Sequence, residues 1–256
     1  QYKDNIIKRD TFSNEEGFQV DYYFNLENGI DKNGLQLVVE QPWLWKVYVN
    51  EKLIQPNGTA WYLDKDFKRF DIKELAREGK NKISIVVSKM RVHAEVEPVY
   101  ILGNFDLKSA EKGWTITEAT PAVMGSWKTI GKPLYGQSAS YSKIFSAKKG
   151  EKYKVKLGKW SGTAALLKVN GELVDNISYP PYESALGEVL KEGQNTVEII
   201  VIGSLKNTLG PHHNKPKPGM VSPWLWRGVK NFPEGSDYDV YDYGLFEDFN
   251  LQKIMD

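Results

Sequence analysis

The sequence predicts an all-β protein that consists of two tandem antiparallel β-sandwiches. Apolar and polar residues alternate with period two over many short segments, such as 153–157, 83–87 and 197–201, which is typical of half-solvated strands. Turn-forming pairs, among them Asn33-Gly34 and Asn170-Gly171, separate these segments,. Many short strands without long helices indicate sandwiches. A run of sequence that occurs twice indicates two of them.

The repeated run contains three matched segments about 120 residues apart. In each copy a strand with a central Asn is followed by a short apolar segment and then by a Glu-Gly-x-Asn turn into another strand: 47–54, 70–75 and 78–88 in the first copy, and 167–174, 186–190 and 192–201 in the second. Residues 72–77 and 185–190 are each predicted to form a turn or two of helix before a glycine. Because the copies share a fold, function is expected where they differ.

A further matched segment predicts where each sandwich closes. Residues 100–107 resemble residues 243–251, so the predicted domains are 1–107 and 108–256. The second domain contains about 30 extra residues, because 24 residues separate Asn81 from Phe105 whereas 54 separate Asn195 from Phe249. This insertion runs from about 204 to 242 and is rich in aromatics. Long loops are commonly functional or disordered, and we expect this one to be ordered and functional.

Composition excludes several classes of partner. The chain has 34 Lys and Arg against 33 Asp and Glu among 256 residues, so no net field attracts nucleic acid or an anionic membrane. No cysteine is present, which excludes disulfides and thiolate metal sites. No apolar run reaches the roughly 18 residues that a membrane span needs. The chain begins with Gln1 and has no Met before Met90, and we expect it to be a piece of a longer protein.

Two groups of residues resemble known families. Val-Asn-Gly at 169–171 with Leu-Lys-Glu-Gly-Gln-Asn-Thr-Val at 190–197 resembles the galactose-binding-domain-like jelly rolls of large bacterial glycoside hydrolases in the β-galactosidase and β-glucuronidase clan. Tyr135-Gly136 and Tyr141, followed by Ser-Leu-Lys-Asn-Thr-Leu-Gly-Pro-His-His at 204–213, look like the C-terminal part of α-L-rhamnosidase-like enzymes. The two copies together cover nearly the whole chain.

This resemblance implies a non-catalytic accessory region of an exported, polysaccharide-degrading glycoside hydrolase, in the periplasm, at the cell surface or outside the cell. The catalytic domain would lie upstream and would be a partner of this region. Jelly rolls of this kind often contain a structural calcium ion held by carboxylates and carbonyls, but the sequence does not locate one. No other cofactor is expected.

Sugar binding requires aromatic faces for the pyranose ring and polar groups for its hydroxyls. A Pro-Trp-Leu-Trp-basic string occurs at 42–46 and again at 223–227; if extended, both Trp of a string point the same way. Packing into a core or a neighbouring domain is the competing interpretation for both pairs. The second string lies in the insertion, beside two histidines. The predicted carbohydrate-binding residues are therefore Trp224, Trp226, Arg227, His212, His213 and Tyr182.

Metal binding and catalysis find less support. His212 and His213 are adjacent, so on an extended chain they point in opposite directions, and hydrogen bonds that organise the loop are the preferred role. The densest acidic groups, 237–242 and 247–248, are interpreted as solvated faces rather than as a glycosidase pair.

Two alternatives to sugar binding remain. The sandwiches could serve only to brace the catalytic domain, with their aromatics filling the interfaces. Alternatively, the chain could be a self-contained jelly-roll lyase or hydrolase; a lyase would use Tyr or His as base with Arg or Lys neutralising a uronate.

Overall fold

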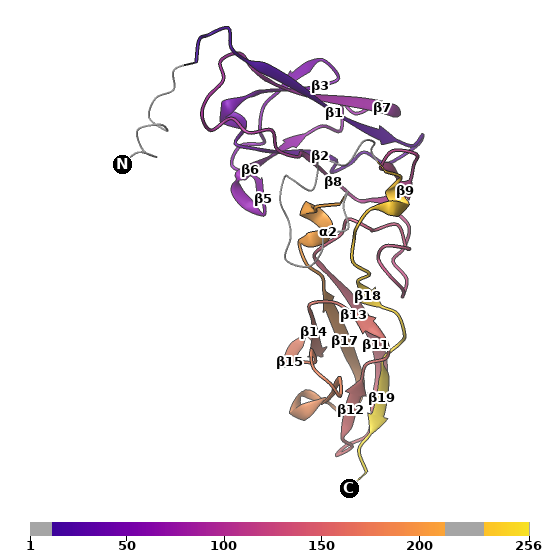
Figure 1. Cartoon of the computed structure of the whole chain (residues 1–256). Coiled ribbons are helices and arrows are strands. Elements are labelled where there is room, and N and C mark those ends of the chain that lie inside the picture. Colours follow the sequence, from indigo (N-terminus) through magenta and orange to yellow (C-terminus); the bar gives the residue numbers. More distant parts are fainter. Residues whose placement is uncertain (1–11, 213–232, 256) are drawn as a thin grey trace, which may run out of the picture. The chain divides into compact units, whose positions relative to one another are not determined.

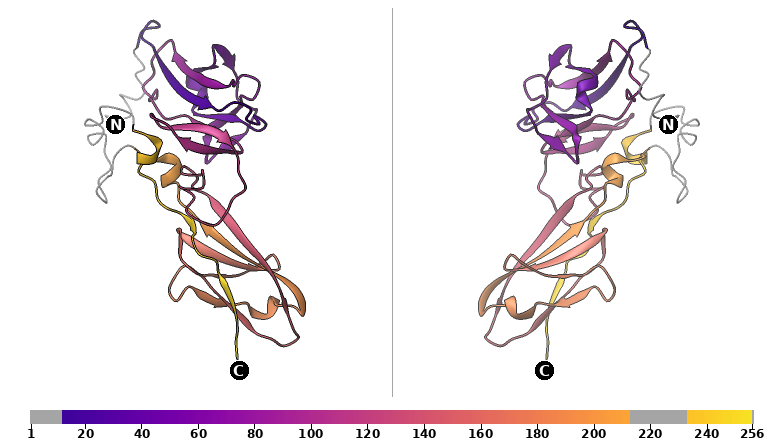
Figure 2. Two further views of the ribbon diagram at one scale, coloured as in Figure 1. Left: turned by 90° about the vertical axis from the view of Figure 1, so that its right-hand side faces the viewer. Right: turned by 90° about the vertical axis from the view of Figure 1, so that its left-hand side faces the viewer.

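The computed structural model describes residues 12–212 and 233–255 (Figures 1 and 2). The chain divides into two compact units. Unit 1 comprises residues 1–108 and 114–119, and unit 2 comprises residues 109–113 and 120–256. The described secondary structure is strand, apart from a few turns of helix, so the predicted all-β class is confirmed.

Unit 1 contains two sheets around one core. The six-stranded sheet has the order β4-β3-β7-β1-β10-β9 and the four-stranded sheet the order β5-β6-β2-β8. The bounds are β1 (Phe18–Leu26), β2 (Gln36–Glu40), β3 (Lys46–Val49), β4 (Lys52–Ile54), β5 (Trp61–Tyr62), β6 (Asp64–Asp71), β7 (Gly79–Val87), β8 (Tyr100–Leu102), β9 (Phe105–Ser109) and β10 (Trp114–Glu118), with the 3-10 helix η1 (Pro42–Leu44) between β2 and β3. Leu37 and Phe70 from one sheet and Val49 and Ile83 from the other belong to the same buried cluster, so the two sheets share one core.

Along the chain, the boundary between the units is crossed more than once: residues 109–113 belong to unit 2, residues 114–119 to unit 1, and the rest to unit 2. The sequence predicts a single boundary at 107. Strand β10 follows that boundary, yet it pairs with β1 in parallel, with Leu26 opposite Ile116. Ile116 is buried in the unit 1 cluster. Its apolar side chain explains why the chain adds this strand to unit 1 before continuing into unit 2.

Unit 2 is also built of small sheets around one core. Its sheets have the orders β11-β17-β14-β15, β16-β12-β19 and β13-β18. The bounds are β11 (Ser138–Ala147), β12 (Tyr153–Lys156), β13 (Trp160–Ser161), β14 (Ala164–Val169), β15 (Glu172–Asn176), β16 (Glu183–Ala185), β17 (Gly193–Ile202), β18 (Gly244–Leu245) and β19 (Asn250–Lys253), with η2 (Gly187–Val189), α2 (Lys206–Leu209) and η4 (Gly235–Asp237). All three sheets contribute to the core, as Val155, Leu167, Ile199 and Leu245 illustrate.

Two asparagines organise the repeated connection in unit 1. Asn81 is fully buried; its Oδ1 accepts a hydrogen bond from the Arg77 N–H (2.8 Å), and its Nδ2 donates to the carbonyls of Arg77 (2.7 Å) and Gly79 (3.0 Å). Asn50 Nδ2 donates to Asn81 Oδ1 (2.8 Å), and Asn50 Oδ1 accepts from the Lys82 N–H (3.0 Å). The pair therefore ties the turn after β3 to the start of β7.

Unit 2 repeats this network atom for atom. Asn195 Oδ1 accepts from the Lys191 N–H (2.9 Å), and Asn195 Nδ2 donates to the carbonyls of Lys191 (2.7 Å) and Gly193 (2.9 Å). Asn170 Nδ2 donates to Asn195 Oδ1 (2.8 Å), while Asn170 Oδ1 accepts from the Thr196 N–H (3.0 Å). The sequence repeat is thus a structural repeat, centred on equivalent buried amides.

The same asparagines explain why the two predicted helical segments are so short. Residues 72–77 form a single hydrogen-bonded turn, in which the Ala76 N–H donates to the Ile72 carbonyl (2.8 Å), and residues 185–190 contain only the three-residue η2. Asn50 Nδ2 binds the Leu75 carbonyl and Asn170 Nδ2 binds the Val189 carbonyl. Because these carbonyls bond to side chains, they do not propagate a helix.

Replacing Asn195 with Ala is expected to lower the free energy of unfolding of unit 2 by about 2–4 kcal/mol, because several buried backbone groups lose their partner at once. Urea denaturation followed by tryptophan fluorescence measures the change. Asn250→Ala, at an exposed position of β19, is the control and should stay within about 0.5 kcal/mol of the parent. Equal midpoints for the two variants would contradict the proposed role of the network.

Candidate functional site

The described ends of the predicted insertion, residues 204–212 and 233–242, are joined by polar contacts. We call this group of contacts the base of the insertion. Asn207 is fully buried; its Nδ2 donates to the Tyr241 carbonyl (2.9 Å) and its Oδ1 accepts from the Tyr241 N–H (2.8 Å). Lys206 Nζ donates to the Pro211 carbonyl (2.8 Å) and lies 3.5 Å from the Asp239 carboxylate. Two side chains of α2 therefore bind the backbone of residues 239–241, where the chain leaves the insertion.

His212, one of the predicted sugar-binding residues, belongs to this base. Its ring stacks on Tyr238, with centroids 5.6 Å apart and planes 21° apart. Its Nε2 is hydrogen-bonded to the Asn207 carbonyl (2.9 Å), and its own carbonyl accepts from the Asp239 N–H (2.8 Å). These contacts agree with the loop-organising role that the sequence favours for this histidine.

The other predicted site residues do not join this cluster. Trp224, Trp226, Arg227 and His213 lie outside the described residues. Tyr182 packs edge-on against Trp160, with ring centroids 5.6 Å apart, and it borders the unit 2 core. It therefore belongs to a second aromatic cluster.

The other residues that resemble rhamnosidase-like enzymes support the same base. A side chain at Gly136 would place its Cβ 2.3 Å from the Ser204 carbonyl, so only glycine permits this close approach. Thr208 Oγ1 donates to the Leu134 carbonyl (3.0 Å). Tyr141 Oη accepts from Trp127 Nε1 (3.0 Å). In the structure, the residues of this motif therefore serve packing and hydrogen bonding within unit 2.

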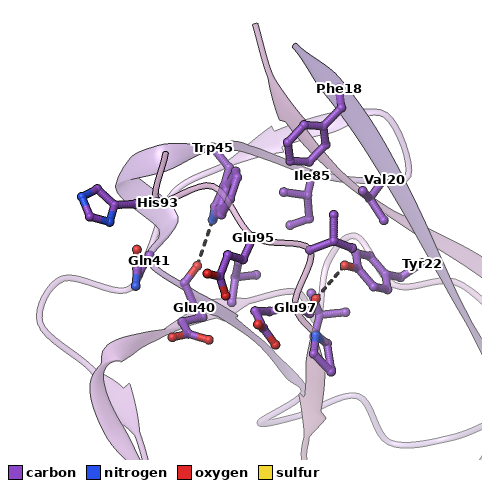
Figure 3. A pocket seen from close by; sticks show the side chains of 14 residues that line it. Phe18, Val20, Tyr22, Glu40, Gln41, Trp45, Ile85, His93, Glu95 and Glu97 are labelled. Carbon is purple, nitrogen blue, oxygen red and sulfur yellow. Dashed lines mark hydrogen bonds between the residues drawn. The ribbon is translucent and has the colours of Figure 1, made fainter. Parts of the chain in front are cut away.

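Unit 1 contains a pocket that the sequence analysis does not predict. It encloses about 160 Å³, which is below the usual range for drug-sized ligands. Figure 3 shows Phe18 and Trp45 on one side and the carboxylates of Glu40, Glu95 and Glu97 on the other. The lining comes from β1, β2, β7, the residues on either side of η1 and the segment before β8. It comprises Phe18, Val20, Tyr22, Val39, Glu40, Gln41, Trp45, Ile85, His93, Glu95, Val96, Glu97, Pro98 and Val99.

The first Pro-Trp-Leu-Trp string supplies one wall of this pocket. It is not extended: Pro42 begins η1, after Gln41 in a left-handed conformation (φ 45°). The two indoles consequently separate, with Trp43 60% exposed and Trp45 lining the pocket. Trp45 Nε1 donates to the Glu40 carbonyl (2.9 Å), and its ring lies 6.1 Å from that of Phe18. The Trp45 indole is thereby fixed between core and pocket.

The opposite wall gathers negative charge from the half-buried Glu40 and from Glu95 and Glu97, which are exposed to solvent at the mouth of the pocket. Burial, then repulsion from Glu97 and from further carboxylates (Asp64, Asp66 and Glu95), raises the pKa of Glu40. Burial, then repulsion from Glu95 and a hydrogen bond with it, raises the pKa of Glu97. In the described part of the chain, neither of them nor Glu95 forms an ion pair with a basic residue.

One sequence signal could have pointed to this wall. Glu95 and Glu97 are two positions apart in a segment without regular structure, so on an extended chain both carboxylates point to the same side. The Tyr22 hydroxyl donates to the Glu97 carbonyl (2.6 Å) and fixes this segment to β1.

Two classes of feature are not observed among residues 12–212 and 233–255. No three His, Asp or Glu side chains there are grouped so that they could hold a metal ion. No helix in this part of the chain has the length and apolar character to cross a bilayer.

Comparison with known proteins gives similarity to solved structures. No protein-family model matches the chain, and no curated protein matches it. A rhamnosidase from Novosphingobium sp. is 17% identical (TM-score 0.37; 91% of this chain, 25% of that one). An α-L-rhamnosidase from Streptomyces avermitilis, complexed with L-rhamnose, is 10% identical (TM-score 0.28; 75% and 22%). A glycosyl hydrolase family 2 member from Bacteroides cellulosilyticus is 10% identical (TM-score 0.25; 92% and 30%). The chain thus spans less than a third of each protein.

Glu40→Gln is expected to raise the melting temperature at pH 7 by on the order of 1–3 °C, the shift that a few tenths of a kcal/mol produces in a domain of about 100 residues. Folding raises the pKa of this carboxyl, so its ionisation weakens the fold as pH rises above the ordinary Glu value. At about pH 3.5, where the carboxyl is protonated in both states, the gain should disappear. A gain that is equal at both pH values, measured by calorimetry, would contradict this account.

Asn207→Ala is expected to cost about 1–3 kcal/mol, because the Tyr241 backbone groups lose their buried partner. The local signature is faster hydrogen exchange at the Tyr241 amide, with the Ile199 amide in the core little changed. Leu209→Ala in the same helix, at an exposed position, is the matched control. Unchanged protection at Tyr241 would show that the base does not depend on Asn207.

Proposed function

We propose that this chain is a non-catalytic, carbohydrate-binding accessory region of an exported glycoside hydrolase, composed of two tandem galactose-binding-domain-like jelly rolls. The observation that carries the proposal is the unit 1 pocket, with an indole and a phenyl ring facing three carboxylates. The partners would be a polysaccharide or oligosaccharide and the upstream catalytic domain of the same protein.

The two walls of the pocket suit the two kinds of surface on a sugar. Aromatic rings pack against the C–H face of a pyranose, and carboxylates accept hydrogen bonds from its hydroxyls. Trp45 is held by its hydrogen bond to Glu40 and by contact with Phe18, so little side-chain entropy is lost on binding. The small volume favours one sugar residue and weak affinity.

The insertion of unit 2 would provide a second binding surface. Its described part presents the ring of His212 against that of Tyr238, and the Tyr241 side chain is exposed. The sequence adds Trp224, Trp226, Arg227 and His213 to this segment, with Tyr182 as part of a further aromatic cluster.

Bracing of the catalytic domain is the second candidate role. In unit 2, Ile144 is 66% exposed on β11 and Leu173 is 63% exposed on β15, the two edge strands of one sheet. A neighbouring domain would bury these apolar side chains. Bracing by unit 2 is compatible with sugar binding by unit 1.

The lyase alternative is disfavoured at the unit 1 pocket. A uronate needs a cationic side chain to neutralise its carboxylate, whereas this pocket contains Glu40, Glu95 and Glu97, and none of its lining residues in the described part of the chain is Lys or Arg. The resulting charge repulsion would oppose binding of such a substrate.

Tryptophan fluorescence titration against a panel of polysaccharides, including rhamnose-containing pectins, tests the proposal. Saturable quenching is expected, and Trp45→Ala should weaken binding about tenfold, which corresponds to about 1.4 kcal/mol. Trp43→Ala, in the same string but outside the pocket, is the matched control. Trp224→Ala and Trp226→Ala test the insertion separately.

Trp45→Phe, which keeps an apolar ring, and circular dichroism of each variant separate lost binding from lost folding. A folded parent protein that shows no saturable response to any glycan would refute the carbohydrate-binding role and would favour bracing alone.

A further inference from the structure

We propose that the unit 1 pocket recognises a positively charged sugar, namely the free ammonium group of an amino sugar within a glycan. This inference rests on the proposed carbohydrate-binding function and specifies its ligand. Two features of the same cavity carry it: a carboxylate wall without a basic partner in the described chain, and an aromatic wall opposite.

The carboxylate wall receives negative charge from three separate segments of the chain. Glu40 lies at the end of β2, and Glu95 and Glu97 come from the segment between β7 and β8. Asp64 and Asp66 of β6 add to the repulsion at Glu40. Among the described residues, His93 and Tyr22 also line the pocket, and Tyr100 interacts electrostatically with Glu40 and Glu97 from outside it; burial raises the pKa of both tyrosines, to about 12 for Tyr100. The field is therefore negative at neutral pH, which favours a cation.

The aromatic wall is the second requirement for an organic cation. Phe18, Tyr22 and Trp45 line the cavity, and an ammonium group near an aromatic face is attracted by the ring quadrupole. The same rings can pack against the C–H face of the sugar that bears the amine. A cavity with both walls suits a compact apolar ring with one positive charge.

A metal ion is a poorer match to this cavity. The carboxylates of Glu40, Glu95 and Glu97 do not form a group that could hold a metal within the described chain. Aromatic side chains occupy much of the lining, and they are not ligands for the oxygen-preferring cations. The geometry therefore favours an organic ammonium ion, which makes hydrogen bonds and cation–π contacts, over a metal ion, which needs a complete set of oxygen ligands.

Calorimetric titration of the full chain at about pH 6 tests the inference with three tetrasaccharides of the same linkage: β-1,4-linked glucosamine, N-acetylglucosamine and glucose. They differ only in whether carbon 2 carries an amine, an acetamide or a hydroxyl. We expect the glucosamine tetramer to bind at least tenfold more tightly than the other two. Glu95→Gln and Glu97→Gln should each remove most of this preference.

The control variant is Glu27→Gln, which changes an exposed carboxylate outside the pocket and should leave the preference intact. The affinity for glucosamine should fall as pH is lowered from about 6 to about 4, because the ammonium binds the ionised carboxyls and Glu40 and Glu97 have raised pKa values,. Added salt should weaken this binding more than any binding of the neutral tetramers.

Three outcomes would overturn the inference, and they differ in what they leave standing. Equal affinity for the three tetramers, lost in Trp45→Ala, would refute ammonium recognition while supporting carbohydrate binding. No binding of these tetramers or of the polysaccharide panel by the folded protein would refute both. The third outcome uses a fourth ligand, Nα-acetyl-lysine amide, which has a free ε-ammonium group but no sugar ring. If its affinity equals that of the glucosamine tetramer, the pocket recognises basic peptide side chains and not sugars.

Discussion

The buried asparagine pair is the constraint on which each of the two units depends. Asn81 and Asn195 lie where water cannot reach them, so each amide must find its partners within the protein. The partners are backbone groups of the preceding turn and the side chain of Asn50 or Asn170. This requirement fixes how the chain enters β7 and β17. Because side chains alternate along a strand, it also fixes which residues enter the core.

The two units share the connection that leads into β7 and β17. They differ in the next connection, which leads from β7 to β8 in unit 1 and from β17 to β18 in unit 2. In unit 1, residues 88–99 join β7 to β8 and supply Glu95 and Glu97 to the pocket. In unit 2, the corresponding connection from β17 to β18 contains the insertion and its base at Asn207 and His212. Both candidate sites thus occupy the same place in the repeat. Connections on a rigid sandwich can vary without disturbing its core, which is why function concentrates there.

The sequence predicts features that depend on neighbours along the chain, and fails where distant residues decide. The strands, the two-fold repeat and the extra length near residue 204 follow from local pattern and spacing. The helical segments at 72–77 and 185–190 stay within the predicted turn or two, and the contacts that end them come from Asn50 and Asn170, which bind their carbonyls from elsewhere in the chain. The pocket draws on several separated segments, so no single window of sequence reveals it. Trp45 enters it only because Gln41 takes a left-handed conformation.

The net charge of the chain does not reveal the group of carboxylates at the unit 1 pocket. The chain is nearly balanced, with 34 basic and 33 acidic residues, and surface lysines elsewhere pair with acids, as Lys253 does with Glu151 (2.8 Å). At the unit 1 pocket the acids repel one another instead, and the pKa values of Glu40 and Glu97 rise. A raised carboxyl pKa means that ionisation costs folding free energy at neutral pH. A ligand that supplies positive charge would recover this free energy on binding, so the proposed preference for a cation would follow from the same repulsion.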